Sequence, residues 1–306
     1  MKRIFMLVVT NFAIIAVLGL VWNVLDASFG ITQSMAAMGM PAEFGYIAVM
    51  SLVLGFGGSF ISLWMSKGAA KRSMGVHVIE TPSTREERWL MNIVKRQADK
   101  VGIDMPEVGI FHGAPNAFAT GARKNSALVA VSTGLLEEMT SDEVEAVLGH
   151  EMAHVANGDM VTQTLLQGVL NTFVIFFARV IAHLVNSVLS GNKDNEGSSS
   201  GGSYGMTYFM VSMAAQVLLG FLASFVVMWF SRHREFYADK GGADLAGREK
   251  MIAALRRLQQ ASAPDDLPGE MAAFGISGKI GEGLNRLRMT HPPLEERIAA
   301  LQENRY

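Results

Sequence analysis

Long apolar segments alternate with polar segments along this chain. Residues 4–25 and 44–65 are almost entirely apolar, and two further apolar segments cover residues 161–189 and 206–230. A helix of about 20 apolar residues is long enough to cross the hydrocarbon core of a bilayer. The pattern therefore predicts four membrane-spanning helices. The first segment is longer than the apolar core of a signal peptide, so we expect an uncleaved span rather than a cleaved leader.

The third apolar segment differs from the others because it contains Arg179 and His183, one helical turn apart. Ionisable side chains are costly in lipid, so we expect both to face the protein interior, water or an interface. Full spanning is the preferred interpretation of this segment. The alternative is a partly amphipathic helix that lies against the soluble part of the protein.

The distribution of basic residues predicts the side of the membrane on which each polar segment lies. The loop 26–43 has no Lys or Arg, and the Gly/Ser-rich linker 191–205 has a single lysine. Basic residues instead follow the second and fourth spans, at Lys67, Lys71, Arg72, Arg232 and Arg234. By the positive-inside rule, the loop and the linker lie outside, whereas residues 66–160, residues 231–306 and both termini face the cytoplasm.

The first cytoplasmic segment has the pattern of alternating helices and strands. Thr84 with Glu87, and Thr140 with Glu143, form capping boxes that predict helices from about residue 85 and about residue 141. Short β-like runs lie between the two boxes, at residues 108–111, 117–120 and 127–131. These runs predict a small sheet or meander.

The expected fold class is α+β and mainly α, with four membrane helices and a cytoplasmic domain formed from two chain segments. Its parts are residues 1–65 with two spans, residues 66–160, residues 161–230 with two further membrane segments, and residues 231–306.

Composition narrows both the class of protein and the kind of site. Half of the residues are hydrophobic, 18% are charged and the mean hydropathy is +0.25, values that are typical of a membrane protein. The net charge of −2 and the lack of a basic, aromatic-rich run make nucleic acid an unexpected partner. Because the chain has no cysteine, a metal site must be built from His, Asp and Glu side chains.

His150, Glu151 and His154 form an HExxH motif inside the helix predicted from residue 141. Side chains four residues apart leave the same face of a helix, so the two imidazoles can bind one ion while Glu151 acts as general base. A catalytic zinc keeps three protein ligands and one open position. The motif therefore predicts one Zn²⁺ per chain and a third ligand from elsewhere in the sequence.

Spacing alone does not identify this third ligand. The candidates are Glu235, His233, Asp159 and His291. Asp239 would share a helix face with Glu235 and could orient a metal-binding imidazole through a hydrogen bond. His233, His291 and nearby arginines are also the candidates for a donor to a developing oxyanion.

Four segments resemble the HtpX family of membrane metalloproteases, relatives of the CAAX prenyl proteases. They are PNAFATG, HEMAHVANGD, SRHREFYADKGGA and THPPLEERIAAL, and the similarity extends over nearly the whole chain. The resemblance implies a gluzincin-like zinc peptidase domain with the ligands His150, His154 and Glu235. It also implies that Glu151 assists the attack of a metal-activated water on a peptide carbonyl.

The same resemblance implies an enzyme of the bacterial inner membrane. Its expected substrates are misfolded membrane proteins, their cytoplasmic loops or other unfolded polypeptides, cleaved in stress-related quality control. The run that starts at Asn116 is expected to be an edge strand that aligns substrate by backbone pairing, the alternative being an ordinary buried strand. Asp239 and His291 are expected to support the metal or to contact substrate.

Three other functions are compatible with parts of this pattern. A transporter or channel would need ionisable groups in several spans, and only the third span has them. A catalytically silent zinc scaffold would have no use for Glu151 beside a ligand. A membrane hydrolase for prenylated or otherwise lipidated peptides is the closest alternative, and the sequence does not separate it from general proteolysis of membrane proteins.

Overall fold

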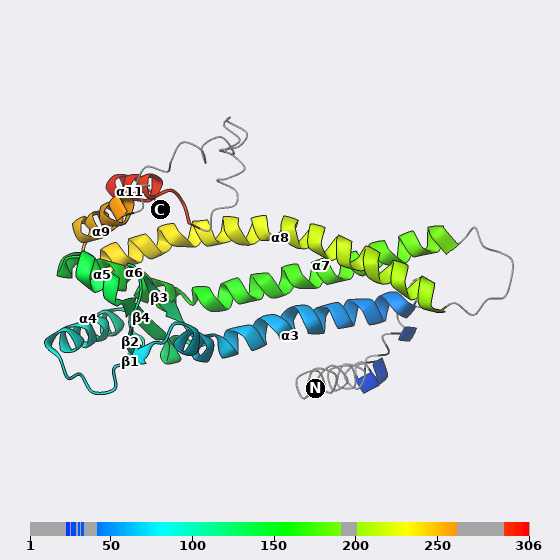
Figure 1. Ribbon diagram of the computed structural model, residues 1–306, viewed down its shortest axis with the longest axis horizontal. Coiled ribbons are helices and arrows are strands. Elements are labelled where there is room, and N and C mark those ends of the chain that lie inside the picture. The colour runs from blue at the N-terminus through cyan, green and yellow to red at the C-terminus, as the bar shows by residue number, and fades with distance from the viewer. Residues whose placement is uncertain are drawn as a thin grey trace. The chain divides into compact units, whose positions relative to one another are not determined.

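A computed structural model describes residues 23–24, 26–28, 30, 32–33, 42–190, 201–261 and 291–305 (Figure 1). The first predicted span, residues 4–25, lies almost entirely outside this part of the chain. The helices of the part described here are α3 (Ala42–Ser73), α4 (Arg85–Val101), α5 (Thr133–Glu138), α6 (Ser141–Asn157), α7 (Asp159–Ser190), α8 (Gly201–Ala246), α9 (Arg248–Ala261) and α11 (Leu294–Glu303). A short 3-10 helix covers Lys124–Ser126, and the strands are β1 (His77–Val78), β2 (Glu107–Phe111), β3 (Ala117–Thr120) and β4 (Leu128–Ser132).

Three of these helices are long and apolar enough to cross a membrane. Within the described ranges, the candidate spans are Phe44–Ser73, Asp159–Leu189 and Gly205–Ala246. They contain the second, third and fourth apolar segments of the sequence. The linker 191–205 was expected to end at residue 205, but α8 already begins at Gly201. Once a helix is nucleated, each added residue gains a hydrogen bond, so it extends past its apolar part.

The chain divides into two compact units. The first contains the described residues of Met1–Ser59 and Gln167–Ala223, and the second contains those of Phe60–Leu166 and Ser224–Tyr306. The first unit is therefore built from parts of the long apolar helices, and the second holds the sheet and the HExxH motif.

Small residues bring α3 and α7 close together in the first unit. A Cβ atom added to Gly55 would lie 2.6 Å from the backbone nitrogen of Thr172, and one added to Gly168 would lie 2.7 Å from Phe56. Beside this contact, the Asn171 amide lies 3.5 Å from the hydroxyl of Ser59. Close backbone approach and polar contacts between helices are typical of packing inside a bilayer.

The second unit contains a mixed sheet with the strand order β1-β2-β4-β3. Strands β2 and β4 are parallel, while β1 and β3 each pair antiparallel with their neighbour. The predicted sheet is thus present, but it is not a meander. In a meander, strands that follow one another in the chain pair with each other, whereas here β2 pairs with β4 and β3 lies beyond β4 at the edge of the sheet. Every residue of β4 is buried. Figure 1 shows α4, α5 and α6 next to this sheet.

Both predicted capping boxes are present and fix the starts of α4 and α6. The Thr84 hydroxyl accepts from the Glu87 backbone, the Thr140 hydroxyl accepts from the Glu143 backbone, and each glutamate bonds back to the cap residue. Helix α6 ends at Gly158, whose φ of 70° is a left-handed conformation that glycine adopts at little cost. Its register, and hence the direction of the motif side chains, is defined at both ends.

Glycines allow α8 to cross α6 directly at the HExxH motif. A Cβ atom on Gly149 would lie 3.2 Å from the Cα of Gly242, and a Cβ atom on Gly241 would lie 2.4 Å from the Cβ of Ala153. The two helix backbones can meet this closely only because side chains are missing on both sides of the contact. The crossing brings the segment around Glu235 next to the motif.

Replacing Gly241 with alanine is expected to destabilise the protein by about 1–3 kcal/mol, because the added methyl group overlaps Ala153 and pushes α8 away from α6. The measurement is the thermal unfolding midpoint of the detergent-purified chain. Gly220→Ala is the matched control, since the same helix has open space around Gly220. A midpoint for Gly241→Ala that equals the control would contradict the steric explanation.

Candidate metal centre

Helix α6 presents two imidazole rings toward one point. The Nε2 atoms of His150 and His154 lie 3.2 Å apart, and the rings meet nearly edge to face with an interplanar angle of 88°. His150 is buried, and His154 is partly buried. Their one-turn spacing on a well-capped helix is what the HExxH motif predicts.

Helix α8 contributes a carboxylate that lies next to the two imidazoles. Glu235 is buried, with its Oε2 atom 3.5 Å from Nε2 of His150 and its Oε1 atom 3.4 Å from Nε2 of His154. Ligands at about 2.0–2.1 Å from one tetrahedral ion lie about 3.3 Å from each other. The three observed separations match this value, so His150, His154 and Glu235 could hold a metal ion.

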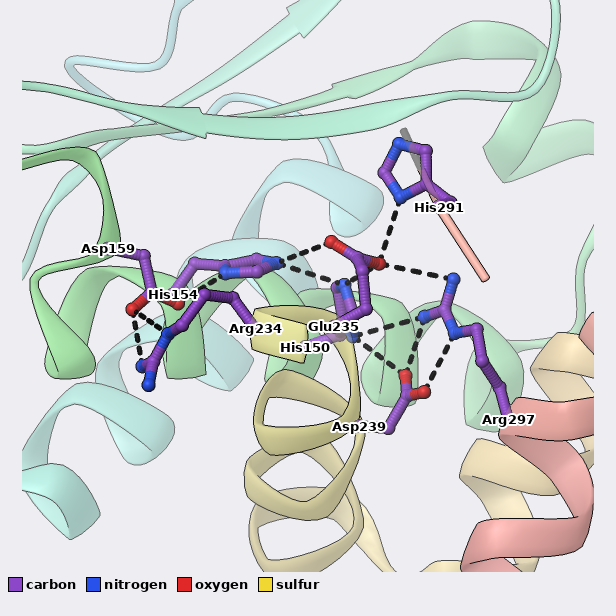
Figure 2. A network of polar contacts seen from close by, with 8 residues as sticks. All are labelled: His150, His154, Asp159, Arg234, Glu235, Asp239, His291 and Arg297. Carbon is purple, nitrogen blue, oxygen red and sulfur yellow. Dashed lines mark hydrogen bonds and ion pairs between the residues drawn. The ribbon is translucent and has the colours of Figure 1, made fainter. Parts of the chain in front are cut away.

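Each imidazole uses its other nitrogen to bind a carboxylate (Figure 2). Nδ1 of His150 lies 3.0 Å from Oδ1 of Asp239, and Nδ1 of His154 lies 2.7 Å from Oδ2 of Asp159. These contacts favour the tautomer with the proton on Nδ1, which directs the Nε2 lone pairs toward Glu235. Two lone pairs and a carboxylate that face one another in a buried space fit a cation.

Two arginines complete the polar network around these carboxylates. Arg297 of α11 donates from Nε and Nη2 to the two oxygens of Asp239, at 2.7 and 2.6 Å. Its Nη1 atom also lies 3.2 Å from Oε2 of Glu235. Arg234 of α8 donates from Nε to Oδ1 of Asp159 at 2.7 Å. Each of the three carboxylates that contact the imidazoles is therefore also bound by an arginine.

The charge of this network favours a positive ion. Burial opposes protonation of His150, but the Asp239 and Glu235 carboxylates outweigh this effect and raise its pKa. Burial likewise opposes protonation of His154, whereas Asp159 and Glu235 raise its pKa to about 10. The negative potential of the carboxylates thus favours protonation of the histidines when no metal is bound. The same potential attracts a divalent cation.

Glu151 lies next to the first imidazole and is the acid–base candidate of the site. Burial raises the pKa of its carboxyl, while the two neighbouring imidazoles and a hydrogen bond from the Ala119 backbone act in the opposite direction. The net rise makes the carboxylate a stronger base than a free glutamate. Ala119 belongs to β3, so Glu151 also links the motif to the edge strand.

A cavity of about 950 Å³ opens beside His150 and Glu151. Its apolar wall comes mainly from α5, α6, α9 and the start of α11, with the side chains of Leu135, Val147, Met251, Leu255, Leu258 and Leu294. Ala117, the first residue of β3, and Asn116 just before it form part of its rim. The cavity is large enough for several residues of a polypeptide, and one strand edge borders it.

The other histidines predicted from the sequence lie in different places. His291 borders the cavity, with Nδ1 3.0 Å from Oε2 of Glu235 and a side chain that is 62% exposed. His233 stacks on Trp229 and borders a separate cavity of about 380 Å³. Among the candidate third ligands, Glu235 alone joins both motif histidines, and Asp159 instead contacts the far nitrogen of His154.

Sequence reasoning missed Arg234 and Arg297, although a signal was present for the second. Leu294, Ile298 and Leu301 mark the apolar stripe of α11, and Arg297 falls on the same stripe. An arginine at a buried helix position needs an acidic partner, so this position could have been selected. Arg234 stands directly before Glu235 in a cluster of charges, and nothing in the local pattern separates it from Arg232.

Comparison with known proteins shows which family the chain belongs to. The model for peptidase family M48 matches residues 84–305. The chain is 54% identical over 303 residues to the protease HtpX of Thioalkalivibrio sulfidiphilus, with 99% of each chain covered. It is 53% identical over 307 residues to the protease HtpX of Alkalilimnicola ehrlichii, covering 100% of this chain and 99% of that one.

Among solved structures, the fold is similar to that of Ste24p from S. mikatae. The TM-score is 0.59 at 19% sequence identity, and the match covers 96% of this chain and 67% of that chain. At this level of identity, the similarity concerns the fold alone.

Proposed function

The chain belongs to peptidase family M48 as an HtpX-type metalloprotease, and from this premise we propose that it is a zinc-dependent endopeptidase of the bacterial inner membrane. The observation that carries the proposal is the buried group of His150, His154 and Glu235, with donor atoms within 4.8 Å of one another. Zinc suits this set of two imidazoles and one carboxylate.

The proposed mechanism divides the work between the ion and the chain. A zinc ion held by these three side chains would polarise a peptide carbonyl and lower the pKa of a water at its open position to about 7. Glu151 accepts a proton from the attacking water and passes it to the leaving amine. Glu151 is partly buried, and its raised pKa supports this role, because a base works best when its pKa is close to the working pH.

We propose His291 as the donor that stabilises negative charge on the carbonyl oxygen. Of the sequence candidates, it borders the cavity beside Glu235, whereas His233 is engaged with aromatic rings elsewhere. Arg297 is less suited to this role because two of its nitrogen atoms are bound to Asp239. An exposed imidazole at the rim can turn toward a substrate as it enters.

The proposed substrate is an extended polypeptide that pairs with β3. Within the described sheet, β3 pairs with β4 on one side, and its first residue borders the cavity. An added strand would gain backbone hydrogen bonds there and place one side chain against the apolar wall. Large apolar side chains are exposed in unfolded and misfolded proteins, which supports misfolded membrane proteins and their cytoplasmic loops as substrates in stress-related quality control.

The orientation in the membrane is proposed from charge. Lys67, Lys71 and Arg72 follow the apolar part of α3, and Arg232 and Arg234 follow that of α8. The positive-inside rule then assigns the segments that carry the metal ligands to the cytoplasmic side. Protease protection of Glu151-containing fragments in inverted and right-side-out vesicles would test this assignment.

Replacing Glu151 with glutamine is expected to lower casein cleavage by about 10²–10⁴-fold while zinc content stays at the wild-type level, because the base is lost and the ligands remain. The measurement combines a cleavage assay of the detergent-purified chain with metal analysis, and a chelator should stop the wild-type reaction. Glu138→Gln, at an exposed position one helix earlier, is the control and should cleave normally. If the wild-type and Glu151→Gln chains both hold zinc and neither cleaves any substrate, a scaffold or a narrow specificity becomes the better interpretation.

A further inference from the structure

A partly buried ion pair joins Asp159, a candidate metal ligand, to Arg234, the residue before the candidate ligand Glu235. Asp159 is the first residue of α7, is only 7% exposed and accepts from Nε of Arg234 at 2.7 Å. The Nη2 atom of Arg234 contacts the same oxygen. The second oxygen of Asp159 lies 2.7 Å from Nδ1 of His154. Figure 2 shows Asp159 between the guanidinium and the imidazole.

The arrangement divides the two oxygens of Asp159 between two partners. An imidazole can rotate about its side-chain bonds, and the hydrogen bond to a carboxylate fixes its orientation and its tautomer. A carboxylate can do this only when it is itself held, and here Oδ1 is held by Arg234. The side chain of His154 is 19% exposed, compared with 10% for His150. Fewer neighbouring atoms restrain the His154 ring, so its orientation depends more on the hydrogen bond to Asp159.

The other imidazole has the same type of support. Asp239 contacts Nδ1 of His150 and is bound through both oxygens by Arg297. Two histidines, two carboxylates and two arginines thus repeat one pattern with residues from α6, α7, α8 and α11. Because the same arginine–carboxylate–histidine arrangement occurs at both motif histidines, we interpret it as support for the metal centre and not as a chance ion pair.

We propose that Arg234 is a positioning residue of the metal centre, which acts by holding Asp159 so that Asp159 fixes the His154 ring toward the metal. This inference rests on the proposed function, since it requires His154 to be a zinc ligand. Arg234 also lies 5.2 Å from the centre of the Tyr237 ring, an interaction that stabilises α8 without involving the metal. The test must therefore measure the geometry of the metal site and not stability alone.

The experiment uses the full chain in detergent and two ions, zinc and cobalt. Zinc affinity is measured by competition with a chelating dye, and the visible absorption of bound cobalt reports the ligand geometry. Arg234→Gln and Asp159→Asn are each expected to lower zinc affinity by about 10–100-fold and to change the cobalt spectrum in the same way. The double variant should bind no more weakly than Asp159→Asn alone, because the arginine acts through the aspartate.

Two further variants separate positioning from folding. Arg256→Gln removes an exposed arginine of α9 and should keep wild-type zinc affinity. Arg234→Lys keeps the charge but cannot present a planar fork to the carboxylate, so we expect an intermediate affinity and a spectrum closer to wild type. This variant also provides the test if Arg234→Gln does not fold.

The outcomes distinguish this inference from the proposed function. Wild-type zinc affinity and an unchanged cobalt spectrum in Arg234→Gln would overturn the positioning role while leaving the metalloprotease intact. Independent, multiplying losses in the double variant would overturn it as well. A wild-type chain that binds no zinc would overturn both the proposed function and the inference.

Discussion

Replacing Glu235 with alanine is expected to remove zinc binding and proteolysis together. The variant leaves two imidazoles on one helix, which cannot complete the set of three protein ligands that a catalytic zinc requires. We expect zinc affinity to fall by more than the roughly 100-fold loss that follows removal of an outer partner. At a zinc concentration that saturates the wild-type chain, casein cleavage by the variant should fall to the background rate.

This result would contrast with that of Glu151→Gln, which is expected to keep its zinc. Glu249→Ala is the matched control, because Glu249 is an exposed glutamate in the first turn of α9. It should retain both zinc and activity. Wild-type zinc affinity in Glu235→Ala would show that the third ligand lies elsewhere.

Replacing Arg297 with methionine is expected to cost about 3–5 kcal/mol of stability, because it leaves the buried carboxylates of Asp239 and Glu235 without their guanidinium partner. A loss of this size corresponds to a drop of roughly 10 °C in the thermal unfolding midpoint. The measurement compares metal-loaded chains in detergent. Methionine fills a similar volume, so lost packing contributes little.

Two comparisons sharpen this prediction. Arg256→Met removes an exposed arginine of α9 and should leave the midpoint within a degree or so of wild type. The pair Asp239→Asn with Arg297→Met should recover part of the loss, since one buried charge is removed together with its partner. An unchanged midpoint in Arg297→Met alone would indicate that solvent already screens Asp239, contrary to its 1% exposure.

Local signals predicted the local features of this protein. The capping boxes at Thr84 and Thr140 and the HExxH motif are each contained within one helical turn or two, so the sequence displays them directly. The apolar segments after residue 44 likewise predicted the long helices, because bilayer thickness sets their length.

Contacts between distant segments were not predictable in the same way. Spacing left Glu235, His233, Asp159 and His291 as candidates for the third ligand, and only the family resemblance selected Glu235. Arg234 and Asp159 are 75 residues apart, and Arg297 is 147 residues from His150. The parallel pairing of β2 with β4 was also missed, since strand order depends on crossovers that residue patterns do not encode.

The separation of the candidate metal ligands along the chain has a consequence for biosynthesis. During translation the two histidines of α6 emerge first, before the apolar segments of α7 and α8, and Glu235 follows only after both. Arg297, 147 residues beyond His150, emerges later still. A nascent chain therefore holds an incomplete candidate centre until α11 has been synthesised and has docked. We therefore expect hydrolytic activity to be absent from the newly made polypeptide, and from its neighbours at the insertion site, until α11 is in place.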